Sequence, residues 1–156
     1  MASPFYYSLK QCSMVWGHHR LGAQMDFEGG IRVVPDQDAW TQIYDIDGTP
    51  IHIRSKRFGG RVTVSLNQAT ALNRDFVLRL IADAQTGLIV APLFVHDPAS
   101  GFGWSAPFAR IQSLPEAAMA RESAALNWVF LCPTLVPIAT PGDATGVHSL
   151  SSGGLF

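Results

Sequence analysis

Residues 61–66 read Arg-Val-Thr-Val-Ser-Leu, and this stretch decides the fold class. Apolar and polar residues alternate strictly along it, and successive side chains of a β-strand point to opposite faces. One face of the predicted strand is apolar and consists of Val62, Val64 and Leu66. The other face is polar and consists of Arg61, Thr63 and Ser65. We therefore expect a sheet with one dry face and one face toward solvent.

Similar short runs lie on both sides of this strand, each bounded by Gly, Pro, Asn or Asp, which indicates a mainly β chain. The predicted strands are residues 30–34, 39–46, 51–55, 61–66, 88–96, 104–112 and 127–131. Turn residues predict tight hairpins at Asp47-Gly48 and at Gly59-Gly60, and a longer loop over 97–101. Successive strands are therefore expected to be antiparallel neighbours.

One segment, roughly residues 70–85, has helical periodicity instead. Its apolar face consists of Leu72, Phe76 and Leu80, spaced four residues apart. Thr70 or Asn73 is a possible cap at the start, and Gly87 is a suitable stop. The sequence thus predicts a single amphipathic helix that packs this face on the sheet. Residues 115–125 leave both a helix and an extended connection open.

The composition limits the classes of protein. A length of 156 residues suits one compact domain. Hydrophobic residues make up 47% and charged residues 15%, against about 25% charged in typical domains, so more surface than usual must be buried. No run approaches the roughly 18 apolar residues of a membrane span, and no secretory leader is visible at the start. We therefore expect the protein to be made in the cytoplasm and not to associate with a membrane. The net charge of -1 disfavours a protein that binds DNA by neutralising phosphates.

His18, His19 and Cys12 are the first candidates for chemistry, because imidazole and thiolate groups bind metals such as zinc. No second cluster completes a set of four ligands, and adjacent side chains on a strand point to opposite faces. Cys12 and Cys132 have no CxxC companions, so both are expected to be buried thiols rather than a disulfide.

Paired carboxylates form the second group of candidates. Asp45 and Asp47 precede Gly48 as in a calcium loop, but the glutamate that should close such a loop is missing. Asp36 and Asp38 lie beside a proline in what reads as a turn. The chain also lacks a GxSxG nucleophile motif and a phosphate-binding glycine loop. We therefore expect no catalytic activity, no cofactor and no bound metal.

Residues 60–68, Gly-Arg-Val-Thr-Val-Ser-Leu-Asn-Gln, together with Thr70, Asn73 and Leu78, form the most specific block of a longer series of weak patterns. In this order they resemble the "G-x-hydrophobic-T-hydrophobic-x-L-x-Q" strand and the helix entry of a family of phage structural proteins. That family builds the inner tail tube, especially in contractile-tailed phages. The resemblance extends over about residues 5–135.

The resemblance implies an antiparallel β-barrel or sandwich with one flanking helix, six copies to a ring, and rings stacked into a tube. Such a tube is part of the virion and is the conduit for DNA ejection, so DNA passes through without specific binding. Its implied partners are further copies of the chain and the sheath, baseplate and tail terminator proteins. The alternatives are a subunit of a noncontractile tail or a related injection machine, or a small ligand-binding β-barrel.

Three sets of residues are candidates for roles in assembly. The polar strand face of Arg61, Thr63 and Ser65 is a candidate lumen or surface face, although a lumen is expected to avoid basic surface. Residues 1–138 are predicted to form the β domain, and residues 139–156, rich in Gly, Ser and Thr, a separate tail. Leu155 and Phe156 at its end are candidates for an apolar anchor between subunits.

Overall fold

The structure is a computed structural model that describes residues 12–22, 30–56, 58–119, 121 and 124–139. In chain order the elements are β1 (Ser13–Trp16), β2 (His19–Leu21), β3 (Ile31–Pro35), β4 (Trp40–Tyr44), β5 (Pro50–Arg54), β6 (Gly60–Asn67), α1 (Leu72–Thr86), β7 (Ala91–His96), β8 (Phe102–Ile111), β9 (Ala125–Cys132) and β10 (Val136–Ala139). Every strand pair is antiparallel. The predicted mainly β fold with one flanking helix is confirmed.

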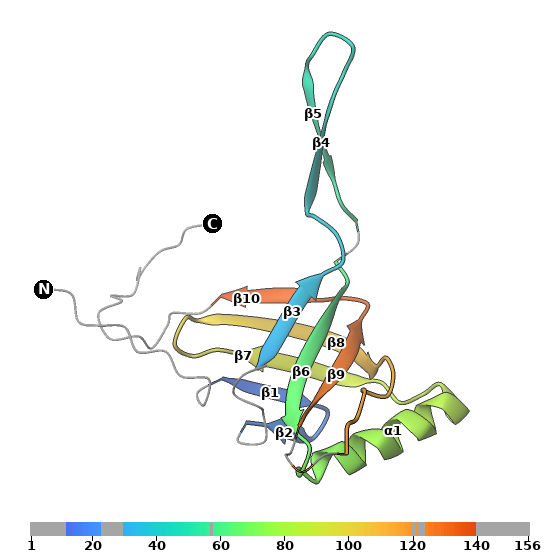
Figure 1. The fold of residues 1–156 in the computed structure, drawn as a ribbon. Coiled ribbons are helices and arrows are strands. Elements are labelled where there is room, and N and C mark those ends of the chain that lie inside the picture. Colours follow the sequence, from blue (N-terminus) through green and yellow to red (C-terminus); the bar gives the residue numbers. More distant parts are fainter. Residues whose placement is uncertain (1–11, 23–29, 57, 120, 122–123, 140–156) are drawn as a thin grey trace, which may run out of the picture.

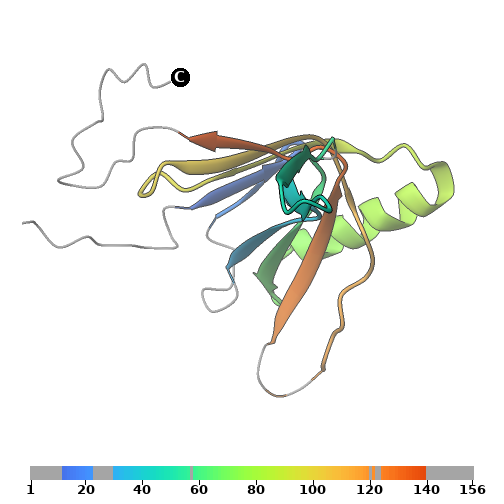
Figure 2. The same ribbon diagram turned by 90° about the horizontal axis from the view of Figure 1, so that it is seen from above.

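The strands form two layers that share β8 (Figures 1 and 2). The first layer contains β2, β1, β7, β10 and most of β8, and the second contains the end of β8 with β9, β6 and β3. β8 pairs with β7 and β10 over most of its length, and with β9 at Arg110 and Ile111, so it passes from one layer to the other. The strand path ends at β2 and β3, which do not pair. The described strands therefore form an open, folded sheet and not a closed barrel.

Aromatic side chains from both layers meet the helix in the core. Phe76 of α1 is fully buried, and its ring centroid lies 5.6 Å from that of Trp16, 5.4 Å from Trp128 and 5.7 Å from Phe130, all edge to face. This is the arrangement that aromatic rings prefer. Leu72 and Leu80 are partly buried against the same cluster. The helix thus closes one end of the space between the two layers.

The start of α1 is held by a side chain within the helix. Asn73 is buried, and its Nδ2 donates to the main-chain oxygen of Asn67 at 2.9 Å. Its Oδ1 accepts a hydrogen bond from Trp128 Nε1 at 2.9 Å. The N-cap residue is Ala71, with no side-chain cap bond, so the prediction of Thr70 or Asn73 as a cap was wrong. Asn73 instead ties α1 to β6 and β9.

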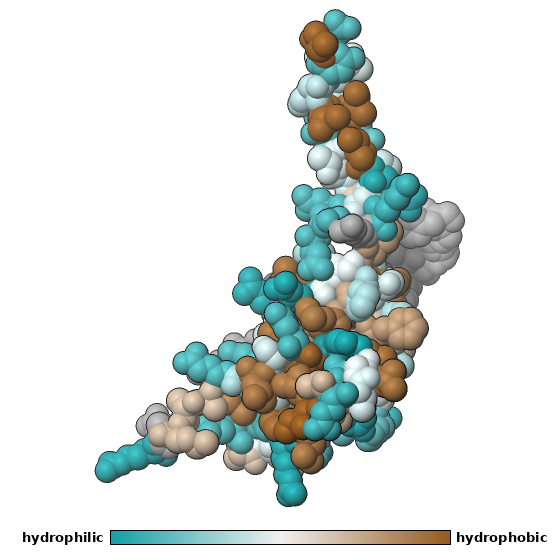
Figure 3. All heavy atoms as spheres, turned by 90° about the vertical axis from the view of Figure 1, so that its right-hand side faces the viewer, coloured by the Kyte–Doolittle hydropathy of each residue, from teal (hydrophilic) through white to brown (hydrophobic). Residues whose placement is uncertain are grey.

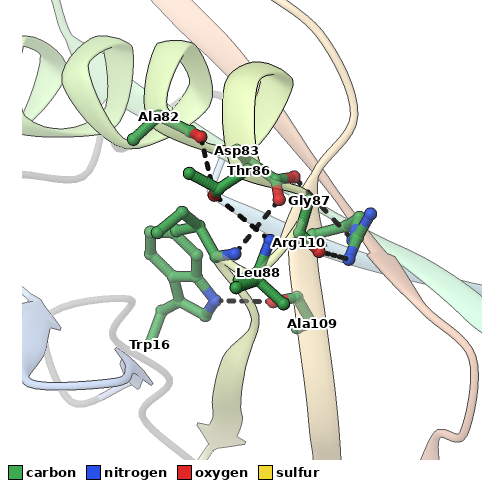
Figure 4. A network of polar contacts seen from close by, with 9 residues as sticks. Trp16, Ala82, Asp83, Thr86, Gly87, Leu88, Ala109 and Arg110 are labelled. Atoms are coloured by element: carbon green, nitrogen blue, oxygen red, sulfur yellow. Dashed lines mark hydrogen bonds and ion pairs between the residues drawn. The ribbon is translucent and has the colours of Figure 1, made fainter.

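The end of α1 is fastened to β8 (Figure 4). Gly87 ends the helix in the left-handed region with φ 69°, as predicted. Its N–H donates to the main-chain oxygen of Asp83 at 2.7 Å. Arg110 of β8 donates to the Gly87 oxygen at 3.1 Å, and its Nε lies 3.8 Å from the Asp83 carboxylate. Nearby, Trp16 Nε1 donates to the oxygen of Ala109 at 3.1 Å. The contacts of Arg110 thus fix the end of the helix on β8, and the Trp16 bond ties β1 to the same strand.

Strand pairing differs from the simple succession that the turns predicted. Gly59-Gly60 does not form a hairpin, because β6 pairs with β3 and β9 and not with β5. The loop at 97–101 does join two paired strands, β7 and β8, as predicted. The strands β1, β2 and β10 were not predicted, and β7 begins at Ala91 rather than Leu88. Residues 115–119 contain neither helix nor strand.

Candidate assembly surfaces

The β4–β5 hairpin, which we call the arm, stands away from the two layers (Figures 1 and 3). It is inserted between the adjacent strands β3 and β6, whose ends Pro35 and Gly60 face each other in the ladder. At its base the Asp36 N–H donates to the oxygen of Gly59 at 3.0 Å. The arm therefore leaves and re-enters the second layer at one place.

The tip of the arm is the predicted Asp47-Gly48 hairpin turn. Gly48 has φ 80°, a conformation that glycine adopts without strain. The Asp47 N–H donates to Asp45 Oδ1 at 2.8 Å, and the Gly48 N–H donates to the main-chain oxygen of Asp45 at 2.9 Å. Asp45 therefore stabilises the turn, as expected for a hairpin rather than for a calcium loop.

The arm has an aliphatic face and an aromatic, polar face. Ile43 lies opposite Ile51, and Ile53 extends the same face beside Thr41. The other face consists of Trp40, Gln42, Tyr44, Pro50, His52 and Arg54. On that face His52 Nε2 lies within hydrogen-bond distance of Gln42 Oε1, at 3.0 Å.

All ten strand residues of the arm are exposed. Its large apolar residues include Trp40, which is 60% exposed, Tyr44 at 66% and Ile46 at 104%. An isolated two-stranded hairpin is marginally stable in water, and an exposed apolar patch of this kind marks a contact surface. Figure 3 shows apolar side chains along the arm, clear of the body. The arm is thus a surface suited to contact with another chain.

A groove of about 900 Å³ runs between the base of the arm and the body. It is lined in part by Asp36, Asp38, Thr41, Ile53, Trp104 and Leu135. Asp36 and Asp38, the paired carboxylates beside Pro35, therefore both line this groove. The groove joins the aliphatic face of the arm to apolar side chains of β8 and of the loop before β10, which extends the contact surface onto the body.

The outer face of the second layer carries the polar residues predicted at the start of β6. Arg61 is exposed and Thr63 is half-buried, but Ser65 is buried and its Oγ donates to Asn127 Oδ1 at 2.6 Å. The expectation of a uniformly wet face was therefore wrong at Ser65, because a polar partner on β9 satisfies its hydroxyl. Arg32 of β3, opposite Thr63, adds a second exposed cation that the sequence patterns did not single out.

The histidine pair lies at the β1–β2 turn, against the core. The His18 and His19 ring centroids are 4.3 Å apart, which corrects the expectation of opposite faces, because Gly17 and His18 belong to the turn and not to a strand. Burial is the main cause that lowers the pKa of His19, with smaller effects from His18 and Arg79. Within the described residues no group of three or more metal-ligating side chains is present.

Cys12 and Cys132 are both buried, as predicted. Burial, with a smaller contribution from the Asp36 carboxylate, raises the pKa of Cys132 to about 11. A thiol with this pKa carries almost no thiolate at neutral pH and is a poor nucleophile. Leu155 and Phe156 lie outside the described residues. No helix in the described part of the chain is long and apolar enough to cross a membrane.

Comparison of the sequence with protein-family models and with curated proteins returns no match. The fold does match solved structures from contractile injection particles. One is the sheath/tube terminator of the PVC extracellular contractile injection system in its extended state. The TM-score is 0.60 and the identity 12%, over 88% of this chain and 100% of that chain.

Two further structures have the same fold. For the tube-terminating cap of the anti-feeding prophage the TM-score is 0.56 and the identity 12%, over 90% of this chain and 95% of the other. For a chain of the PVC sheath–tube complex, the corresponding values are 0.54 and 13%, over 85% and 91%. The chain therefore shares, over nearly its whole length, a fold that occurs in tube-terminating and sheath–tube components of contractile injection particles.

Proposed function

We propose that this protein is a structural subunit of a contractile phage tail or a related injection particle, where copies form hexameric rings that stack as part of the tail tube. The observation that carries the proposal is the exposed apolar arm on a fold shared with components of such particles. An arm on one copy that contacts a different surface on the next is a head-to-tail contact, and such contacts produce closed rings or open stacks.

The strand edges support the same function. Within the described residues β2, β3 and β10 each have one edge without a partner strand. Unpaired N–H and C=O groups on such edges attract another strand, and ring closure removes them. The closed barrel implied by the family resemblance would then be a property of the assembled ring, formed by strands of several copies.

Exposed arginines on the second layer help to decide which surface faces the lumen of the proposed tube. Strands β3, β6 and β9 contain Arg32 and Arg61 and no acidic residue. A lumen lined by this face would bind DNA phosphates and slow the passage of DNA. We therefore assign the face of Arg61, Thr63 and Ser65 to a contact between proteins and propose that another surface lines the tube.

Electron microscopy and sedimentation of the purified protein test the proposal. We expect the wild-type protein to form rings or stacked rods as its concentration rises, and a variant with residues 37–55 replaced by a short glycine linker to stay monomeric. The control is Leu78→Ser, which changes an exposed leucine of α1 and leaves the arm intact. A wild-type protein that remains monomeric at every concentration would refute the proposed function.

A second candidate is a subunit that closes the end of a tube, because two of the matching structures are a terminator and a cap. The same images distinguish the two roles. A tube subunit forms rods whose length grows with concentration, whereas a terminator stops at single or paired rings. Binding of labelled rings to the sides or ends of preformed tubes would complete the assignment.

A further inference from the structure

The tip of the arm is acidic as well as apolar. From Tyr44 to Pro50 it contains Asp45 and Asp47 and no cation. Between them Ile46 is 104% exposed, so its whole side chain projects into solvent. The tip thus presents one aliphatic side chain between two carboxylates. A surface that is complementary to it has positive charges around an apolar centre.

The outer face of the second layer has that character. The register places Val34 of β3, Arg61 of β6 and Leu131 of β9 in one row across the layer. Val34 is 43% exposed, and Arg61 is exposed beside it. Arg32 lies two residues before Val34 on the same face of β3, because residues two apart on a strand share a face. The face therefore offers two exposed cations beside exposed aliphatic surface.

The position of the arm keeps its tip away from the face of its own chain. The arm continues upward from the end of β3 and β6, and each of its strands has five residues, a length of about 17 Å (Figure 1). The tip therefore lies well beyond the row of Val34 and Arg61. If a second copy is displaced along the direction of the arm, the outer face of its β3, β6 and β9 comes level with the arm tip of the first copy.

We propose that the arm tip of one copy docks on the outer face of β3, β6 and β9 of the next copy. Asp45 and Asp47 then lie near Arg32 and Arg61, and Ile46 packs on Val34 and Leu131. This proposal rests on the proposed function and names the two surfaces that meet. Opposite charges across such a contact set its orientation and register more than its affinity.

A charge-reversal pair tests the contact. Asp47→Lys and Arg61→Glu each place like charges together, so we expect each single variant to need about a tenfold or higher protein concentration to assemble. The double variant Asp47→Lys/Arg61→Glu restores the attraction and should assemble like the wild type. Asp45 stays unchanged in this series because its Oδ1 holds the turn.

Matched controls reverse charges elsewhere. Arg74→Glu changes an exposed arginine of α1, and Glu116→Lys changes an exposed acidic residue outside the arm and its groove. Both should assemble at the wild-type concentration. The melting temperatures of the single variants at low concentration should equal that of the wild type, because Asp47 and Arg61 are both exposed.

Cross-linking gives an independent measurement. A mixture of Ile46→Cys and Val34→Cys proteins should form a mixed disulfide dimer, whereas Ile46→Cys with Leu78→Cys should not. If the wild type assembles but the charge variants assemble equally well and no Ile46–Val34 cross-link forms, the docking proposal is wrong and the proposed function stands. If the wild type does not assemble at all, both are wrong.

Discussion

Strand β6 in the body and the two strands of the arm have similar alternating sequences but opposite surroundings. Val62 and Val64 of β6 are 0% exposed, whereas Ile43 and Ile51 of the arm are 44% and 43% exposed. The difference is that β6 lies over the aromatic cluster and α1, while no other strand or helix among the described residues packs on the arm. Alternation thus predicts that a strand has an apolar face. The tertiary structure decides whether other parts of the same chain bury that face.

This comparison separates two kinds of apolar residue. Those of the body should determine the free energy of unfolding of a single chain. Those of the arm should determine association between chains and have little effect on the fold.

The largest effect on stability is expected for Phe76→Ala. Phe76 packs edge to face against four aromatic rings and is fully buried, so its removal leaves a cavity and should lower the free energy of unfolding by about 3–5 kcal/mol. Chemical denaturation measures the change. The control is Leu78→Ala on the same helix, 55% exposed, for which we expect a change below about 0.5 kcal/mol. Equal effects for the two variants would contradict this assignment of the core.

A pH-dependent effect of intermediate size is expected at His19. Its ring stacks on Trp16, and its Nε2 is buried without a hydrogen-bond partner among the described residues, which disfavours the charged form. The folded pKa lies below the ordinary value of 6.5, so the unfolded chain takes up a proton first on acidification. The stability contributed by neutral His19 is therefore present above pH 6.5 and is lost as the pH falls toward the lowered folded pKa.

Thermal melts between pH 7.5 and pH 5 measure this dependence. We expect the wild type to lose stability over this range and His19→Gln to lose less. His52→Gln, which changes a histidine of the arm, should follow the wild-type profile. Parallel profiles for the wild type and His19→Gln would show that another group controls the acid response.

The smallest effect on folding is expected in the arm. The double variant Ile43→Thr/Ile51→Thr introduces threonine, which also favours strands. Because both positions are exposed, the free energy of unfolding should change by less than about 0.5 kcal/mol. Assembly should nevertheless weaken, since the aliphatic face is lost. In the core, Val64→Thr likewise introduces a hydroxyl but buries it, and should cost about 1–3 kcal/mol. A loss of body stability in the arm variant would show that the arm is part of the core.

Features that depend on neighbouring residues in the chain could be predicted from the sequence. The alternation of β6, the turn at Asp47-Gly48 and the helix stop at Gly87 are of this kind. Phe76 could also be placed on the apolar face of a helix by spacing alone. Each of these predictions needs only the local period or the conformational freedom of glycine.

Features that depend on distant partners could not be predicted. Gly59-Gly60 looks like a hairpin, but Gly60 lies in the ladder between Pro35 and Cys132, where a Cβ would come within 2.7 Å of Leu135 Cδ2. The short strand β10 contains Pro137, and β8 is its one partner among the described strands, so nothing in its own residues marks it as a strand. The arm was missed as a candidate assembly surface for the same reason, since the sequence does not show which apolar strand face remains uncovered, whereas the face of Arg61 and Thr63 was among the predicted candidates.

The insertion of the arm between β3 and β6 has a mechanical consequence. A pull on the tip along the arm reaches the body through two adjacent strands at once and loads both lengthwise. β6 is paired with β9 along eight residues, and the hydrogen bonds of an antiparallel ladder are perpendicular to the strands. Such a load shears the ladder and is shared by all its hydrogen bonds, whereas a pull across the strands would break them one after another. The junction is therefore suited to transmit tension from the arm to the body without peeling the sheet apart.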